Sequence, residues 1–335
     1  AGTAAAICVR RDITPRAIHD RHMPSFRETL AANDQSIIGY RLSEESDLSR
    51  TAHVRASSTA KLEVTDGTLW HNLGEPICLV VPVATETLGS ISFETKVLTP
   101  GVLVVQVFSC DRAENYRLQN HVGTHDVECH TDGRITIPIE ASPGAGQKLF
   151  ILFRPAKNIL LRCGAARLTG ALCFSWHGTG EPGPGTHLSP LPFLPCFSVT
   201  PEQDVYAPTN LNNGYIRPFG LPNTWASAPF SEGRAEWVEY TLSCEETISR
   251  VDLVFHTGLN AARFDSHGVF PETVREYTVE AITATGPVSL LTVNGNFLRF
   301  RRHRFKPIRA TGVRLTIHAT WGHERAELFD MRVYR

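Results

Sequence analysis

A group of amide, guanidinium and indole side chains between positions 210 and 225 has the composition of a ligand-binding loop. Its members are Asn210, Asn212, Asn213, Arg217, Asn223 and Trp225. Amides and guanidinium groups can hydrogen-bond to sugar hydroxyls, and an indole can stack on the face of a pyranose ring. The same residue types also stabilise turns, and Asn213 followed by Gly214 is a turn signal in its own right. The cluster is therefore a candidate ligand site, with a structural role in the loop as the favoured alternative.

Histidine and cysteine residues elsewhere have a spacing that metal ligands can use. His121, His125 and Cys129 are four residues apart, and His130 follows directly. Nitrogen and sulfur ligands of this kind bind zinc. However, Gly123 disfavours a helix here, and a strand would separate ligands four residues apart by about 13 Å. A fourth ligand is not evident either, so we predict no metal site.

No residues for independent catalysis stand out. Asp265, Ser266 and His267 are the residue types of a hydrolytic triad, but three consecutive residues cannot converge on one reacting atom. The glycine pair of 144–146 lacks the third glycine of a dinucleotide fingerprint and does not open a helix. We therefore expect neither a catalytic site nor a complete dinucleotide-binding fold in this chain.

One concentrated basic segment lies near the carboxyl end. It comprises Arg299, Arg301, Arg302, Arg304 and Lys306, interleaved with Phe300, His303 and Phe305. Such a stripe can bind nucleic acid. In a strand, however, alternation would divide the charge between two faces. We favour arginines that pair with acidic residues or backbone carbonyls across a domain interface, and we expect no nucleic-acid partner.

Composition supports a globular protein of two domains. The 335 residues include 42% hydrophobic residues, and 33 Lys and Arg nearly balance 34 Asp and Glu. No apolar stretch is long enough to span a bilayer. The eight cysteines form no CxxC pair, and Cys78, Cys110 and Cys173 lie in apolar runs typical of buried thiols. The sequence does not decide whether any of the cysteines form disulfides, or in which cellular compartment the protein lies.

Periodicity predicts a mainly β fold of two β-sandwich domains preceded by a short helical segment. Residues 1–49 have a helical pattern, whereas alternation from about residue 50 predicts a first sandwich over 50–177. A stretch rich in Pro and Gly over 178–195 is typical of a linker. A second sandwich is predicted over 196–335, where apolar residues alternate in several segments, as in Val251, Leu253 and Phe255.

The chain resembles the carboxy-terminal portion of FAD-dependent oxidoreductases. The Gly-Thr-Ala-Ala-Ala run at 2–6 is similar to the helix start that faces the flavin in that family, which implies that Gly2, Thr3 and Ala4 contact FAD held mainly by an upstream domain or chain. The segments Asn212–Pro218, Pro222–Trp225 and Asn296–Phe305 resemble the tail of the same family. The resemblance covers most of the chain, strongly at 1–58 and 205–335 and only by pattern in between, and it predicts that sequence precedes residue 1.

The second sandwich also resembles the galactose-binding-like, discoidin-type jelly roll. The similarity runs through Asn210–Gly214, Glu236–Tyr240, Val251–Phe255, Tyr277–Glu280 and Phe329–Tyr334. It implies carbohydrate as a plausible ligand and a structural calcium near 210–225. Our main hypothesis is an accessory region that supports a flavin-dependent catalytic domain and binds carbohydrate. The alternative is a stand-alone carbohydrate- or surface-binding protein without catalysis, and a purely structural covering or oligomer-forming role is compatible with the first.

Overall fold

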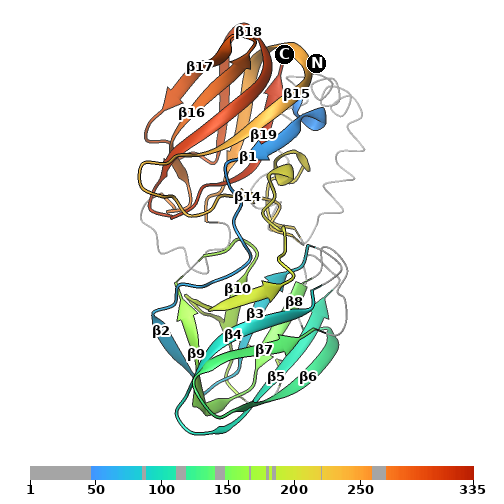
Figure 1. Cartoon of the computed structure of the whole chain (residues 1–335), viewed down its shortest axis with the longest axis vertical. Coiled ribbons are helices and arrows are strands. Elements are labelled where there is room, and N and C mark those ends of the chain that lie inside the picture. The colour runs from blue at the N-terminus through green and yellow to red at the C-terminus, as the bar shows by residue number, and fades with distance from the viewer. Residues whose placement is uncertain are drawn as a thin grey trace.

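The computed structural model describes residues 47–335 with the exception of 85–87, 111–117, 140–147, 166, 179–180, 183–185, 220 and 259–268. These residues form two lobes built almost entirely of antiparallel strands (Figure 1). The predicted mainly β fold with β-sandwiches is confirmed. The helix predicted within 1–49 lies outside the described residues, except that a 3₁₀ turn, η1, begins at its end (Ser49–Thr51). Within the described part of the chain, no helix is long and apolar enough to cross a membrane.

The first lobe contains two sheets packed on a shared core. One sheet has the order β11 (Ser189–Pro190), β10 (Leu172–Ser175), β3 (Ile77–Pro82), β8 (Lys148–Phe153), β5 (Gly101–Cys110) and β6 (Asn120–Cys129). The other has the order β12 (Leu194–Pro195), β9 (Ala156–Gly164), β4 (Ser90–Val97) and β13 (Phe197–Thr200), with β2 (Leu69–Leu73) on β9 and β7 (Gly133–Pro138) on β4.

Side-chain alternation explains how these strands pack. In β4, Ile91 and Phe93 point into the core between the sheets, whereas Ser92 lies on the outer side. In β3, successive residues join two different apolar clusters, because Leu79 faces the core and Cys78 faces a smaller cluster on the other side of the sheet. A strand covered on both faces has a continuous apolar sequence, as β3 does.

The cysteines of the described residues are free thiols. Six are buried and one is exposed: Cys78, Cys110, Cys129, Cys163, Cys173 and Cys196 are buried, and Cys244 is exposed. Burial of the predicted Cys78, Cys110 and Cys173 is confirmed. In the first lobe, burial raises the pKa of the Cys163 thiol to about 12, which keeps it protonated and unreactive at neutral pH.

The second lobe is one sheet folded into two layers. Its order is β14 (Trp225–Ala226), β19 (Glu327–Tyr334), β15 (Glu236–Phe255), β18 (Phe300–Thr320), β16 (Val274–Thr283) and β17 (Gly286–Val293), with β1 (His53–Ala56) on β15. The pairing of β15 with β18 shifts register between Thr241 and Glu246 and again between Ile248 and Arg250. At these irregularities the strands bend, so that Tyr240 on one side and Leu253 on the other meet in one core.

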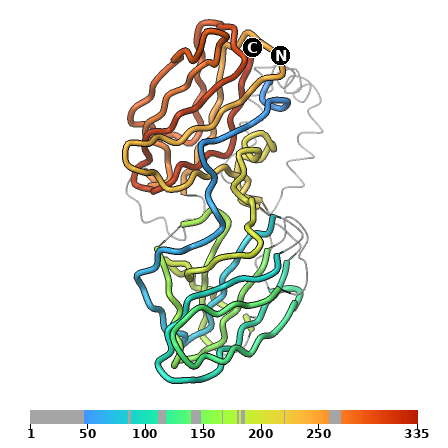
Figure 2. Tube along the Cα trace, viewed as in Figure 1, coloured from blue at the N-terminus to red at the C-terminus, as the bar shows by residue number. Residues whose placement is uncertain are grey.

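Strand pairing departs from the domain boundaries predicted by composition. Strand β1 pairs with β15 of the second lobe, although its residues fall in the range predicted for the first sandwich. Strands β11 and β12 lie within the predicted linker but complete sheets of the first lobe. Strand β13 falls in the range predicted for the second sandwich and also pairs with a strand of the first lobe. The chain crosses between the lobes after β1 and returns after β13 (Figure 2). Short edge strands rich in proline look like linker in sequence, because proline weakens the strand pattern.

A buried carboxylate joins the two lobes. Glu327 at the start of β19 is 2% exposed and accepts a hydrogen bond of 2.6 Å from the hydroxyl of Thr169, which belongs to the first lobe. His256 and His323 lie 3.7 and 3.6 Å from its oxygens. Burial opposes ionisation, but His256, His323 and the Thr169 hydroxyl outweigh it and hold the pKa of Glu327 below its usual range, while burial lowers the pKa of His256 itself. Tyr206 adds a hydrogen bond of 2.9 Å to the Thr169 carbonyl.

We expect Glu327→Ala to lower the free energy of unfolding by about 3 kcal/mol, because it leaves the buried Thr169 hydroxyl without its acceptor and removes the carboxylate that lies between His256 and His323. Urea unfolding measures the change. The matched control is Glu232→Ala, an exposed glutamate of the second lobe, which should change stability by no more than about 0.5 kcal/mol. Equal unfolding curves for the two variants would show that the carboxylate does not hold the lobes together.

Candidate functional site

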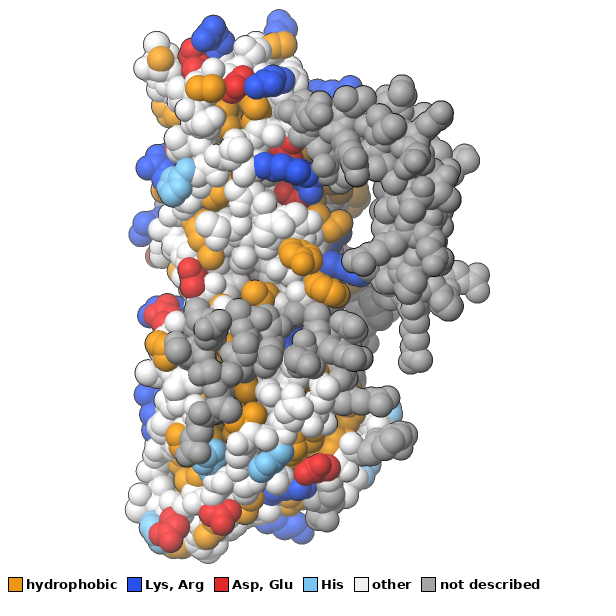
Figure 3. Space-filling model, turned by 90° about the vertical axis from the view of Figure 1, so that its right-hand side faces the viewer, with side chains coloured by type: hydrophobic (Ala, Val, Ile, Leu, Met, Phe, Trp, Pro, Cys, Tyr) orange, Lys and Arg blue, Asp and Glu red, His pale blue; other side chains and the backbone are white. Residues whose placement is uncertain are grey.

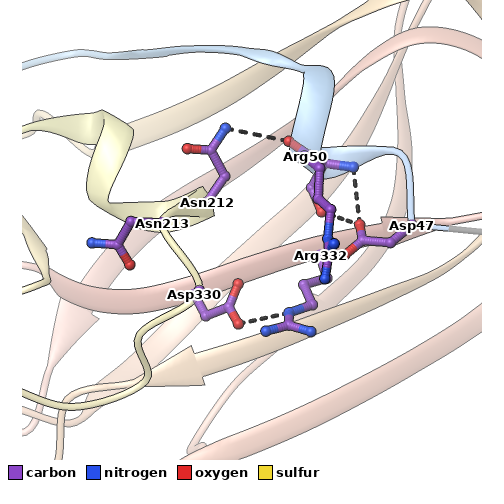
Figure 4. Close-up of a pocket in the computed structure, with 8 residues that line it drawn as sticks. Asp47, Arg50, Asn212, Asn213, Asp330 and Arg332 are labelled. Carbon is purple, nitrogen blue, oxygen red and sulfur yellow. Dashed lines mark hydrogen bonds and ion pairs between the residues drawn. The ribbon is translucent and has the colours of Figure 1, made fainter. Parts of the chain in front are cut away.

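A pocket of about 370 Å³ lies where the first described residues, η2 (Pro208–Asn212) and β19 meet (Figure 4). Among the described residues it is lined by Asp47, Ser49, Arg50, Asn212, Asn213, Gly214, Asp330 and Arg332. Carboxylates, guanidinium groups, amides and a hydroxyl dominate this lining. The pocket can therefore offer both acceptors and donors to a polar ligand.

Strand β19 supplies the charged floor of the pocket. Asp330 and Arg332 are two residues apart and so project on the same face, where the Arg332 Nε donates a hydrogen bond of 2.7 Å to the Asp330 carboxylate. Asp330 is 4% exposed. Burial raises its pKa to about 6 in spite of Arg332, and the nearby carboxylates of Asp47 and Asp252 add to the rise. The charge of this carboxyl group therefore changes just below neutral pH.

The wall opposite β19 is held by backbone contacts. The Leu48 backbone N–H donates to the Val333 carbonyl at 2.8 Å, which fixes the segment beside β19. The backbone N–H and the hydroxyl of Ser49 both donate to the Asp47 carboxylate, the former at 3.0 Å. Tyr240 donates from its hydroxyl to the Leu211 carbonyl at 2.9 Å and so ties η2 to the sheet. Three separate parts of the chain thus meet at the pocket.

Two of the predicted site residues line this pocket. The Asn212 amide donates to the carbonyls of Ser49 and Ala52 at 3.3 and 3.4 Å, so its nitrogen is used to hold the wall (Figure 4). Asn213 is exposed, and its oxygen accepts a hydrogen bond of 2.8 Å from the Tyr215 backbone N–H. Its nitrogen donates to the Asn223 side-chain oxygen at 3.3 Å, so the Asn213 side chain shapes the turn at the edge of the pocket.

Three other predicted site residues have structural roles. Asn210 donates to the carbonyls of Val205 and Thr224, both at 3.0 Å. Asn223 is 4% exposed, has a φ of 54°, and its amide donates to carbonyls within its own loop. Trp225 is fully buried in the core of the second lobe, and its indole N–H donates to the Ser58 carbonyl at 3.0 Å. Because β14 places its ring in the core, Trp225 has the structural role that the sequence analysis favoured and offers no surface on which a sugar can stack.

An exposed pair of aromatic rings follows Gly214 in the same loop. Tyr215 and Phe219 are 45% and 44% exposed, their centroids are 6.0 Å apart, and their planes differ by 16°. Arg217, the sixth predicted residue, lies between them in sequence and is partly exposed. The sequence analysis overlooked this ring pair, although two aromatic residues four apart in a polar loop are a usable signal.

The other sequence candidates do not form a site in the described residues. Gly2, Thr3 and Ala4 lie outside the described residues, as do 265–267. His121 contacts the Thr124 hydroxyl at 2.9 Å on β6, whereas Cys129 of that strand is buried. Within the described ranges, no three His, Cys, Asp or Glu residues are grouped to hold a metal ion. FAD and a structural calcium stay predictions from the resemblance.

The basic segment begins β18 and pairs as predicted, but within the second lobe. Arg302 forms a bidentate ion pair with Asp252 of β15, with nitrogen–oxygen distances of 2.8 and 3.0 Å. Arg299 donates to the Ile216 carbonyl. The expected pairing across a domain interface is therefore wrong for these arginines, because their partners lie on a neighbouring strand and loop of the same sandwich.

Comparison with known proteins finds partial structural similarity. No protein-family model and no curated protein matches the chain. Solved structures that match include the family 32 carbohydrate-binding module of Streptococcus pneumoniae EndoD, with 18% identity, a TM-score of 0.32, and coverage of 39% of this chain and 86% of that one. The family 32 module of Clostridium perfringens NanJ in complex with galactose has 15% identity, a TM-score of 0.30, and coverage of 39% and 86%.

Chitosan-binding module 1 from Paenibacillus sp. IK-5 is a further match, with 16% identity, a TM-score of 0.31, and coverage of 39% of this chain and 86% of the module. Each of these matches covers about two fifths of the chain at low identity. They do not place a ligand here, and the function has to be derived from the residues themselves.

We expect Trp225→Ala to lower the free energy of unfolding by about 3–5 kcal/mol, because it removes a fully buried indole and leaves a cavity. Thermal and urea unfolding measure this loss. Trp70→Ala is the control, since Trp70 is 40% exposed and its removal should cost far less. Wild-type stability in the Trp225 variant would contradict its structural role.

The raised pKa of Asp330 predicts a pH-dependent stability. The folded state binds this proton more tightly than the unfolded state, so the group's contribution is most favourable below about pH 4 and is lost as the pH rises through about 6. Relative to Asp330→Asn, the wild type should lose on the order of 3 kcal/mol between pH 4 and pH 7. Urea unfolding at a series of pH values tests this, with the exposed Asp126→Asn as control. A constant difference between wild type and Asp330→Asn would contradict it.

Proposed function

We propose that the second lobe binds carbohydrate at the pocket between β19 and η2. The observation that carries this proposal is that one loop both lines a polar pocket and carries a stacked pair of exposed rings. Gly214 lines the pocket, and Tyr215 and Phe219 follow it. A sugar needs both kinds of surface, because it has hydroxyl groups around its edge and apolar faces of C–H groups.

The chemistry of the lining supports this ligand class. Each sugar hydroxyl both donates and accepts a hydrogen bond, and the pocket offers carboxylate acceptors from Asp47 and Asp330 beside guanidinium donors from Arg50 and Arg332. A volume of about 370 Å³ lies at the lower end of the range for small-molecule sites. The pocket therefore suits one or two sugar units, with the ring pair available to the next.

This proposal is closest to a carbohydrate-binding module, whether alone or attached to an enzyme. The flavin-dependent partner rests on the resemblance of 1–58 and 205–335 and is supported by no contact in the described residues. A binding sandwich of this kind would hold an attached oxidoreductase near a sugar substrate. Flavin absorbance in the protein purified from its native source tests that part separately.

The test of carbohydrate binding is a glycan screen with the full chain, followed by calorimetric titration of the best neutral ligand. Tyr215→Ala should weaken binding by about 3- to 10-fold, since it removes one ring of the exposed pair. Tyr215→Phe keeps the ring and should retain the affinity. Absence of binding to any glycan by the folded wild type would overturn the proposal, and so would equal affinities for wild type and Tyr215→Ala.

A further inference from the structure

The outer face of the second lobe beside the pocket presents arginines in register on three neighbouring strands. Strand pairing aligns Arg332 of β19 with Asp252 of β15 and Arg302 of β18. The next row on the same face, two residues away on each strand, aligns Tyr334 of β19 with Arg250 of β15 and Arg304 of β18. Residues two apart on a strand share a face, so these two rows lie side by side. We call this surface the arginine face.

The arginine face is a built arrangement with fixed side chains. The Arg302 guanidinium is held by its bidentate pair with Asp252, and Arg332 is held by Asp330. The Arg250 guanidinium carbon lies 3.6 Å from the centroid of the Tyr334 ring. Stacking and ion pairing fix the planes of these groups, which lowers the entropy that a ligand would otherwise lose on ordering them.

Positive charge exceeds negative charge on this face. Asp252 is the acceptor for Arg302 and lies 3.6 Å from Arg250, so two guanidinium groups share one carboxylate. Arg304 is exposed directly across from Arg250 and has no acidic partner among the described residues, and Lys306 follows two positions later. The whole chain has a net charge of −1, so the excess is local. In the one face that Figure 3 shows, Lys and Arg side chains are scattered over the second lobe, and several lie beside Asp or Glu.

The arginine face is continuous with the pocket. Arg332 belongs to both, since it lines the pocket and also begins the row that crosses to Asp252 of β15 and Arg302 of β18. A chain of sugars bound in the pocket can therefore extend over the arginines. Guanidinium groups bind carboxylate and sulfate groups through two parallel hydrogen bonds.

We propose that this face binds anionic polysaccharide, whose carboxylate or sulfate groups contact Arg250, Arg304 and their neighbours while a sugar unit occupies the pocket. The proposal rests on the carbohydrate-binding function and specifies its ligand class. Nucleic acid is the rival polyanion. The polar pocket at one end of the arginine face favours glycan, because the carboxylates of Asp47 and Asp330 accept hydrogen bonds from hydroxyl groups, which each sugar unit carries and the phosphodiester backbone of DNA lacks.

The test compares binding of the full chain to polygalacturonate, dextran sulfate, neutral dextran and single-stranded DNA, together with the best neutral glycan from the screen. We expect at least one anionic glycan to bind about tenfold more tightly than neutral dextran at low ionic strength, and to weaken as salt is added. Comparison of polygalacturonate with dextran sulfate distinguishes carboxylate from sulfate as the recognised group.

Arg304→Glu should weaken binding of the anionic glycan by about tenfold and leave the best neutral glycan unaffected. Arg304→Gln, which only removes the charge, should give a smaller loss in the same direction. Lys96→Glu makes the same charge change at an exposed position of β4 in the first lobe and should alter neither affinity. Thermal unfolding confirms that each variant is folded.

The outcomes separate this inference from the function on which it rests. Binding of a neutral glycan that depends on Tyr215, with no preference for anionic glycans or no effect of Arg304→Glu, would overturn the anionic ligand class alone. Single-stranded DNA that binds as tightly as the anionic glycans would overturn it as well, in favour of general polyanion binding. Failure of every glycan to bind would overturn both proposals.

Discussion

The antiparallel pairing of β15 with β18 is the constraint on which the second lobe depends. Each strand runs through both layers of the sandwich, and the register shifts after Thr241 and Ile248 mark the bend. Because side chains alternate, one register places Val251 and Leu253 in the core and Arg250 and Asp252 outside. A slip of one residue would exchange these two sets, so the core and the arginine face are determined together.

The junction between the lobes adds a second constraint. Residues 201–224 lead from the first lobe back to the second, and several of their polar side chains form hydrogen bonds that fix the course of this segment. Tyr206 bonds to Thr169, and Asn223 bonds to carbonyls of its own loop. Buried amides need such partners, since an unsatisfied one would cost about 1–3 kcal/mol. The exposed residues beside the pocket are therefore those of the turn from Gly214 to Phe219.

The pocket is polar because three separate segments of the chain each contribute polar side chains to its lining. Asp47 and Arg50 come from the first described residues, Asn213 from the loop, and Arg332 from the last strand. Each brings polar atoms already oriented by backbone contacts, as in the bond from Leu48 to the Val333 carbonyl. Partial burial of charges beside solvent gives the site both directional hydrogen bonds and a carboxyl group, Asp330, that titrates just below neutral pH.

The sequence by itself determined the β architecture and much of its core, because alternation such as Val251, Leu253 and Phe255 can only be satisfied by a strand with one buried face. It also located the loop that carries the candidate site. Only the tertiary structure decided which loop residues line the pocket: an indole such as that of Trp225 can lie in a core or on a binding surface, and here it is buried in the core. Asp47 and Asp330 are far apart in sequence but line one pocket, and Arg250 lies opposite Arg304. Both arrangements follow from strand pairing, which the local sequence pattern does not encode.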